Sequence, residues 1–427
     1  MASFTDLIAE RIHLRREEFL AGFAEKPHTD IEQTLAAGIQ AHWHPLLPED
    51  VGDTRHQKPQ VGAVDGSRAT RTLSIGADWV IAQALLLGPN GLRQSAVDTR
   101  LLRGEIERPA VDRCASLLMR SLELDLALAF IQNGSGNVLL LDGSLYADLP
   151  YLLYNLAIGG YEDLPLKVLG QYLDLFDLCR QRDVLLLGVA KRTRSTILGR
   201  ALLAQSRPVM AAELQQGDSL QALEADVQEE ARGNGSTNGS QHQDASFRMD
   251  LTRLPSDGEL LYRWATGSGL TDPVLLGSTS FGHTSAQMVA ALASRLRQTK
   301  STQGFQKQLS PLQERLLAAP AIGTFYMSLV PGEDALRIDA LAHTFGRDDL
   351  HLLEFDHTLM SYTTALPIVR YLLGEYGGLS VYNAALYVVD REVRLHTAIV
   401  DQVYLSVLRC QLGYPVQYDR STRRFIR

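Results

Sequence analysis

Two copies of one short phrase constrain this chain more than any other feature. Residues 61–67 read VGAVDGS and residues 138–144 read VLLLDGS, so each is an apolar run that ends in Asp-Gly-Ser. An aspartate at the end of a buried strand is a carboxylate held in a fixed place. Two such strands side by side would present Asp65 and Asp142 to one divalent metal. The alternative is that each Asp-Gly is a hairpin turn, because Asp-Gly beside apolar runs is a strong turn signal.

The segments around the two phrases predict an α/β fold. In chain order the apolar patterns indicate three strands, a helix, a strand, a helix and a strand. The predicted elements are 61–67, about 70–77, about 79–88, 108–131, 138–142, 164–180 and 183–189. This succession is that of the ribonuclease-H-like mixed sheet: three antiparallel strands, then parallel strands, flanked by helices. In that fold the first and fourth strands are adjacent and parallel, so the two aspartates should meet at one sheet edge, where sites in such sheets are built.

The remaining chain is predicted to add helices and one insertion to this core. Residues 1–60 are expected to form an arm, with an amphipathic helix over 5–25 and then loop with short helical pieces. Residues 61–410 are expected to form a single domain with a flexible, low-complexity insertion at about 212–247, followed by a basic tail at 411–427. Later predicted elements are a strand near 273–280, a helix at 284–298, a hairpin of 321–330 with 335–341, and helices over 348–361, 364–375, 381–390 and 392–411.

Composition narrows the class of protein. The net charge is −8, with 45% hydrophobic and 21% charged residues, which is typical of a globular protein. There is no apolar run long enough to cross a membrane, no secretory signal at the start, and no paired spacing among the three cysteines. We therefore expect a cytoplasmic protein without disulfides. The acidic total argues against a general polyanion binder, but an acidic metal cluster beside a local basic groove remains compatible with it.

A metal-dependent nuclease needs three or four oxygen ligands that converge from separate elements. Asp65 and Asp142 supply two of them, and the helix between the two strands is expected to supply a third. Glu123 lies at the edge of the apolar stripe of that helix, and Asp125 borders the same stripe, so spacing leaves both candidates open. Carboxylates are the ligands that magnesium and manganese prefer, which predicts a site for a hard cation.

Several segments, taken in order, resemble the NurA nuclease family. They are VDGSR at 64–68, RSLE at 120–123, LLDGSL at 140–145, LGVAK at 187–191, FYMSL at 325–329, RID at 337–339 and YNAALYVVD at 382–390. The resemblance covers most of residues 60–410 apart from the insertion, and its specificity lies in the joint order of the segments. The family usually shows Tyr-Pro at the start of the last segment and Ala-His at its end. This chain has Asn383, Val389 and Asp390 at the positions of the proline, alanine and histidine.

The resemblance implies a set of site residues. By position, Asp65, Glu123, Asp142 and Asp390 would surround manganese, with magnesium possible. Because the family has a histidine where Asp390 stands, His396 is an alternative fourth ligand. Lys191 follows a predicted strand near the cluster and is a candidate catalytic residue that would hold a phosphate or a water. The candidate DNA contacts are Arg68, Tyr326 and Arg337, the arginines because their forked donors match phosphate oxygens.

The function implied by the resemblance is that of a manganese-dependent DNA nuclease. It would act as a single-strand endonuclease and a 5′-to-3′ exonuclease in the end resection of double-strand breaks and in recombinational repair. The implied partners are DNA, a hexameric HerA-type ATPase and a second copy of the chain, in the nucleoid-associated cytoplasm. A rival hypothesis is a non-catalytic adaptor of that ATPase, motivated by the altered positions 383 and 390. Another is a nucleotidyl or phosphoryl transferase, although the sequence has no Walker-type loop for a nucleotide.

Overall fold

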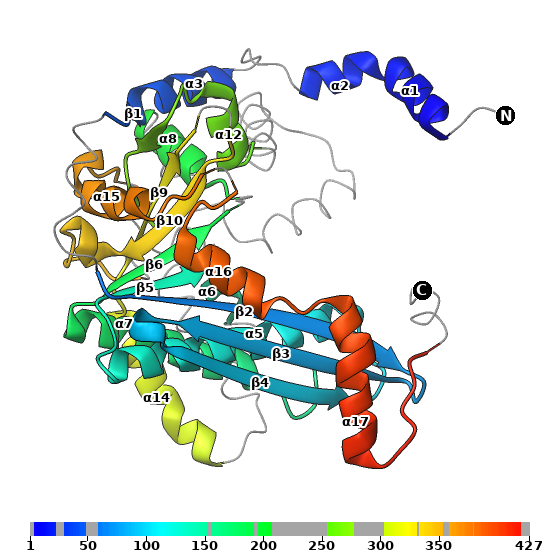
Figure 1. Cartoon of the computed structure of the whole chain (residues 1–427). Coiled ribbons are helices and arrows are strands. Elements are labelled where there is room, and N and C mark those ends of the chain that lie inside the picture. Colours follow the sequence, from blue (N-terminus) through cyan, green and yellow to red (C-terminus); the bar gives the residue numbers. More distant parts are fainter. Residues whose placement is uncertain are drawn as a thin grey trace, which may run out of the picture.

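A ten-stranded mixed sheet organises the chain (Figure 1). The computed structural model describes residues 4–22, 30–47, 59–152, 156–191, 195–206, 254–276, 303–330, 333–352, 358–378 and 380–419. The strand order is β1-β7-β9-β10-β6-β5-β2-β3-β4, and β8 pairs with β9 outside this path. The strands are β1 (Trp43–Pro45), β2 (Val61–Leu73), β3 (Ala77–Leu87), β4 (Arg93–Leu102), β5 (Val138–Asp142), β6 (Leu185–Ala190), β7 (Gly269–Thr271), β8 (Val274–Leu275), β9 (Ile322–Ser328) and β10 (Leu336–Leu341).

The three antiparallel strands at one side of the sheet are β2, β3 and β4, and their bounds correct the sequence prediction. Residues 61–73 form one strand instead of two, and the turn to β3 contains Gly76 in the left-handed conformation with φ +70°. The third strand is β4 at 93–102, which was missed because it is an edge strand with alternating exposed polar residues. An edge strand has one bonded neighbour and needs fewer apolar side chains, so its hydrophobic signal is weak.

The parallel strands continue the sheet from β2. β2 pairs in parallel with β5, and β5 pairs in parallel with β6. The predicted late hairpin is present as β9 and β10, and β10 joins β6 in antiparallel pairing. The first and fourth strands of the core, β2 and β5, are therefore adjacent and parallel as predicted. The architecture is that of the ribonuclease-H-like fold, a mixed sheet flanked by helices.

Helices cover both faces of the sheet. On one face, α5 and α7 enclose the largest apolar core together with side chains of β2 and β5 such as Val64 and Leu141. On the other face, α15 and α16 pack on the neighbouring residues of the same strands, such as Ala63 and Leu140. Figure 1 shows α16 crossing the sheet on the face opposite α5. The helices are α1 (Phe4–Leu14), α2 (Arg16–Gly22), α3 (Asp30–His42), α5 (Arg108–Gln132), α6 (Leu149–Leu152), α7 (Leu164–Arg182), α8 (Ile197–Ser206), α12 (Asp257–Trp264), α14 (Gln303–Ala318), α15 (Leu366–Gly374), α16 (Ala384–Val393) and α17 (Leu405–Leu412).

The outer parts of the chain differ from the prediction in several places. The arm contains α3, a longer helix than the short pieces expected, because Leu35 and Ile39 pack on α8. Residues 348–352 and 358–361 are not helical; His351 and Leu359 instead bridge to neighbouring backbone. The last predicted helix is divided into a π-helical turn, Ile399–Tyr404, and α17. The predicted insertion at 212–247 and the helix at 284–298 lie outside the described residues. None of the helices in the described ranges has the length and apolarity needed to cross a membrane.

Candidate metal centre

The two Asp-Gly-Ser phrases lie next to each other in the same register. The parallel pairing of β2 with β5 runs from Val61 with Val138 to Val64 with Leu141, so Asp65 and Asp142 are the next residues on each strand. Asp142 ends β5, whereas β2 continues through Asp65 into its pairing with β3, so the first Asp-Gly is not a turn. Because side chains alternate along a strand, both aspartates project to the α16 face of the sheet.

α16 brings a third carboxylate to this pair. Asn383 caps the helix, since its side-chain Oδ1 accepts a hydrogen bond from the backbone N–H of Leu386 at 3.0 Å. Asp390 lies two turns further along α16, and one carboxylate oxygen each from Asp65, Asp142 and Asp390 lie within 4.8 Å of one another. His396 is exposed and does not belong to this group. Asp390, at the position where the resemblance implies a histidine, therefore brings a carboxylate oxygen to the two aspartates.

The helix α5 approaches the same place from the opposite face, and Gly66 leaves the space for it. A Cβ atom built on Gly66 would lie 2.3 Å from Oε1 of Glu123 and 2.6 Å from Cγ of Met119. Glu123 is 2% exposed, and its carboxylate faces β2 at Gly66. Asp125 is exposed and accepts a hydrogen bond from Gln171 of α7 at 2.5 Å. The structure thus separates the two candidates that spacing left open, and it places Glu123 beside Asp65.

Burial and mutual repulsion perturb the acidic groups. Burial, and after it repulsion from Asp142, raise the pKa of Asp65 from 3.8 to about 7. Burial likewise raises the pKa of Glu123 from 4.5 to about 7, although the Arg120 guanidinium opposes the shift. Lys191 and Arg120 balance part of the negative charge of the four carboxylates, and a bound divalent cation would balance the rest. The chemistry of the donor set, oxygen atoms from several acidic side chains, fits a hard divalent cation.

Lys191 closes the group on one side. Its ammonium Nζ lies 2.8 Å from Oδ2 of Asp142 and 3.7 Å from Oδ2 of Asp390. The same ammonium lies 5.0 Å from the ring centroid of Tyr382, whose hydroxyl donates to Oδ2 of Asp142 at 3.5 Å. Burial, followed by repulsion from Asp142, raises the pKa of the Tyr382 hydroxyl, which therefore remains a donor. The lysine predicted near the cluster is thus in direct contact with it.

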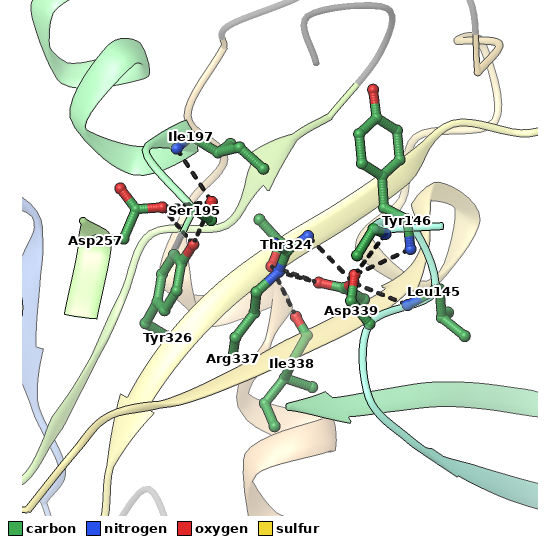
Figure 2. Close-up of polar contacts among 12 residues, drawn as sticks. Leu145, Tyr146, Ser195, Ile197, Asp257, Thr324, Tyr326, Arg337, Ile338 and Asp339 are labelled. Atoms are coloured by element: carbon green, nitrogen blue, oxygen red, sulfur yellow. Dashed lines mark hydrogen bonds and ion pairs between the residues drawn. The ribbon is translucent and has the colours of Figure 1, made fainter. Parts of the chain in front are cut away.

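The turn after Asp142 is held by a buried carboxylate on β10. Gly143 has φ +106°, a conformation that favours glycine, and directs the chain away from the sheet. Asp339 is fully buried, and its Oδ2 accepts hydrogen bonds from the Ser144 hydroxyl at 2.5 Å and from the Leu145 backbone N–H at 3.0 Å. Figure 2 shows Asp339 between Leu145 of this turn and Thr324 of β9, whose hydroxyl donates to Oδ1 of Asp339 at 2.7 Å. The turn that follows Asp142 is therefore tied to β10 through the Asp339 carboxylate.

Two of the three predicted DNA contacts are buried, which corrects their assignment. Arg337 is 4% exposed, and its guanidinium is paired with Asp339 at 2.8 Å. Tyr326 is fully buried, and its hydroxyl donates to Oδ2 of Asp257 at 2.6 Å (Figure 2). Both side chains complete internal polar networks instead of facing a ligand. Arg68 is exposed on β2, three residues beyond Asp65, and stays a candidate contact.

Sequence reasoning missed three residues that support the site: Arg120, Asp148 and Asp339. Arg120 bridges Glu123 and Asp148, with distances of 2.5 Å and 3.0 Å. The available signal was the i,i+3 spacing of Arg120 and Glu123, which places the two side chains on one helix face. Asp148 and Asp339 contact the site through residues distant in sequence, Arg120 and Ser144, so the spacing along the chain does not reveal these contacts.

Comparison with known proteins supports the relation indicated by the sequence. The NurA domain family model matches residues 59–371. The NurA nuclease from Sulfolobus solfataricus superimposes with a TM-score of 0.52 and 14% identity over 96% of this chain and 98% of that chain. A second NurA structure has a TM-score of 0.43 and 12% identity, covering 95% of each chain. A NurA structure with manganese has a TM-score of 0.38 and 15% identity over 94% of this chain and 98% of that chain. A search of curated proteins finds no match.

Proposed function

Because the chain belongs to the NurA family, we propose that it is a manganese-dependent DNA nuclease whose metal is held by Asp65, Asp142 and Asp390. The observation that carries the proposal is the convergence of these carboxylates, from three separate segments, to within 4.8 Å. Glu123 lies outside this group of three, and we propose it as the fourth ligand because its carboxylate approaches β2 from the α5 face, in the space above Gly66. A divalent cation at this place would activate a water molecule and neutralise charge on the scissile phosphate.

The chain's own residues supply the rest of the chemistry. The Lys191 side chain, at the edge of the group, is 38% exposed and its ammonium lies 2.8 Å from Asp142, so a phosphate oxygen near the metal could pair with it. Arg68 is exposed on β2, three residues beyond Asp65, and would offer a second contact to a DNA phosphate. A basic contact beside an acidic cluster explains how a chain with a net charge of −8 can still bind a polyanion.

The direct test is cleavage of end-labelled single-stranded DNA with manganese, magnesium or chelator. We expect cleavage by the wild-type protein with a divalent metal and its loss in Asp142→Asn. The matched pair Glu123→Gln and Asp125→Asn, two residues apart on α5, tests the assignment of the helix ligand. The first should lose activity and the second should keep it. Full metal-dependent cleavage by Asp142→Asn would refute the site.

The altered positions of the last segment do not favour the adaptor hypothesis. Asp390 contributes a ligand atom where the family has histidine, and Asn383 starts α16 with a side-chain cap where the family has proline. Both replacements therefore keep the geometry that presents a ligand to Asp65 and Asp142. A folded wild type that cuts no DNA with any divalent metal, alone or with a cognate ATPase, would revive the adaptor hypothesis.

We extend the proposal to the biological setting that the family resemblance suggests. The enzyme would act as a single-strand endonuclease and 5′-to-3′ exonuclease in end resection and recombinational repair, as a homodimer docked on a HerA-type hexameric ATPase. The apolar side chains of α1, including Phe4, Leu7 and Ile8, are exposed and support a role in such assembly. Substrates labelled at either the 5′ or the 3′ end would give the polarity. Size-exclusion chromatography with and without the ATPase would test both partners.

A further inference from the structure

The guanidinium of Arg120 lies between two carboxylates that come from different elements. Its Nη1 donates to Oε2 of Glu123, one turn along α5, at 2.5 Å. Its Nε donates to Oδ2 of Asp148, in the loop after β5, at 3.0 Å. The Arg120 side chain is only 14% exposed, and the Tyr172 hydroxyl donates to the same Asp148 oxygen at 3.4 Å. The Arg120 guanidinium therefore links α5, which carries Glu123, to the loop that follows Asp142.

We propose that Arg120 is a positioning residue for metal binding, which turns the Glu123 carboxylate so that Oε1 faces the Asp65 strand. This inference rests on the proposed function. Oε2 of Glu123 is engaged by Arg120, while Oε1 is the atom that a Cβ at Gly66 would approach to 2.3 Å. The orientation of the carboxylate is thus set by the arginine at one oxygen and by the open space above the glycine at the other.

Asp148 holds the guanidinium of Arg120 in place, because Asp148 lies in a loop that is hydrogen-bonded at both ends. The loop from Gly143 to Asp148 is pinned at its start, where Asp339 of β10 binds Ser144, whose hydroxyl in turn accepts from the backbone N–H of Ala147 at 3.0 Å. Its other end is held by Arg120 and Tyr172. Hydrogen bonds at both ends of this loop, joined through its backbone, therefore position Asp142 and Glu123 relative to each other.

The sign of the effect on metal affinity separates positioning from electrostatics. A positive charge close to a cation site repels the cation, so at a pH where Glu123 stays ionised electrostatics alone predicts that removing Arg120 tightens metal binding. If Arg120 orients a ligand, its removal weakens binding despite the more favourable charge. Partners that orient metal ligands typically change metal affinity by about 10- to 100-fold when they are mutated.

The experiment measures manganese affinity by isothermal titration calorimetry and the environment of the bound ion by electron paramagnetic resonance. The variants are Arg120→Gln, which removes the charge, and Arg120→Lys, which keeps it. A lysine ammonium is a point charge and cannot reproduce the planar fork. We expect at least about tenfold weaker binding in Arg120→Gln and a smaller but distinct loss in Arg120→Lys, with an altered spectrum of the bound ion.

The matched control is Arg315, which also bridges two aspartates. Its Nη1 lies 2.9 Å from Asp174 and its Nη2 lies 3.0 Å from Asp177, both on α7. Arg315→Gln and Arg315→Lys should leave manganese affinity unchanged, and urea unfolding would confirm that every variant is folded.

Two outcomes would overturn the positioning role. The first is unchanged or tighter binding in Arg120→Gln, and the second is wild-type affinity together with a wild-type spectrum in Arg120→Lys. If the folded wild type itself binds no manganese, the proposed function fails, and the positioning role fails with it. That result differs from a failure of the inference alone, in which wild type and Arg120 variants bind equally.

Discussion

Replacing Asp65 by asparagine should stabilise the metal-free protein at alkaline pH, even though on the proposed function it removes a metal ligand. Asp65 is 9% exposed, and burial together with repulsion from Asp142 raises its pKa from 3.8 to about 7. The replacement is nearly isosteric, and the amide oxygen can still accept the hydrogen bond that the Gly66 N–H donates at 2.7 Å. The main change is therefore the loss of a buried negative charge.

The magnitude and its dependence on pH follow from the raised pKa. Below about pH 4 both folded and unfolded chains are protonated at Asp65, so the asparagine variant gains nothing from the charge. Between about pH 4 and pH 7 unfolding releases a proton, and the wild type loses stability as the pH rises. A rise from 3.8 to about 7 predicts a gain of about 2 kcal/mol at pH 5 and about 4 kcal/mol at pH 8.

Urea unfolding in the presence of a chelator, followed by circular dichroism at pH 5 and pH 8, would measure this difference. Exposed Asp334→Asn is the control and should have the same stability as the wild type at both values. Adding manganese should reverse the order at pH 8, because a ligand that binds only the folded wild type stabilises it. An Asp65→Asn variant that is no more stable than the wild type at pH 8, or whose gain is equal at the two pH values, would refute the reasoning.

Three further substitutions test separate parts of the site. Gly66→Ala would place a methyl group 2.3 Å from Oε1 of Glu123, so calorimetry should show at least about tenfold weaker manganese binding. Asp339→Asn leaves the buried guanidinium of Arg337 without its charge partner, and urea unfolding should show a loss of about 3–5 kcal/mol. Lys191→Met should keep the stability of the fold, because the Lys191 side chain is 38% exposed, while single-turnover DNA cleavage falls about 100-fold.

Each of these substitutions has a matched control. Gly159→Ala introduces a methyl group with no atom within 4 Å and should bind manganese normally. Asp349→Asn removes a carboxylate that pairs with Arg347 two residues earlier, the same spacing as in the buried pair, but at the surface, and should not change stability measurably. Lys167→Met changes an exposed lysine on α7 and should leave cleavage intact. A control that behaves like its partner would show that the effect does not come from the site.

The sequence predicts the part of this protein that depends on local pattern. The apolar run before Asp142 is buried on both faces, and its composition alone marks it as a central strand. The strand before Asp65 could be placed next to it, because the first and fourth strands are neighbours in the fold that this order of elements predicts. Lys191 followed for the same reason, as the residue directly after β6. Neighbouring parallel strands in register bring corresponding residues together, so Asp65 and Asp142 could be placed side by side from the sequence even though β2 continues beyond Asp65.

The remaining features depend on contacts that no local pattern contains. The choice between Glu123 and Asp125 was decided by which face of α5 meets Gly66, a property of packing. Arg337 has the chemistry of a phosphate contact, but the fully buried Asp339 two residues away turns its guanidinium inward. Side chains at positions i and i+2 of a strand lie on the same face of the sheet, as Arg337 and Asp339 do. The sequence pattern does not tell whether other elements cover that face.

The arrangement of the three aspartates along the chain has a consequence for biosynthesis. Asp65 and Asp142 lie in the first third of the 427-residue chain, whereas Asp390 lies near its end. At ~10 residues per second, a ribosome would take on the order of 30 s to travel from the first aspartate to the last. On the proposed function, a nascent chain holds only part of its metal group throughout that interval. Nucleic acid close to the translating ribosome would therefore be exposed to an enzyme that cannot cut until its last helices have emerged.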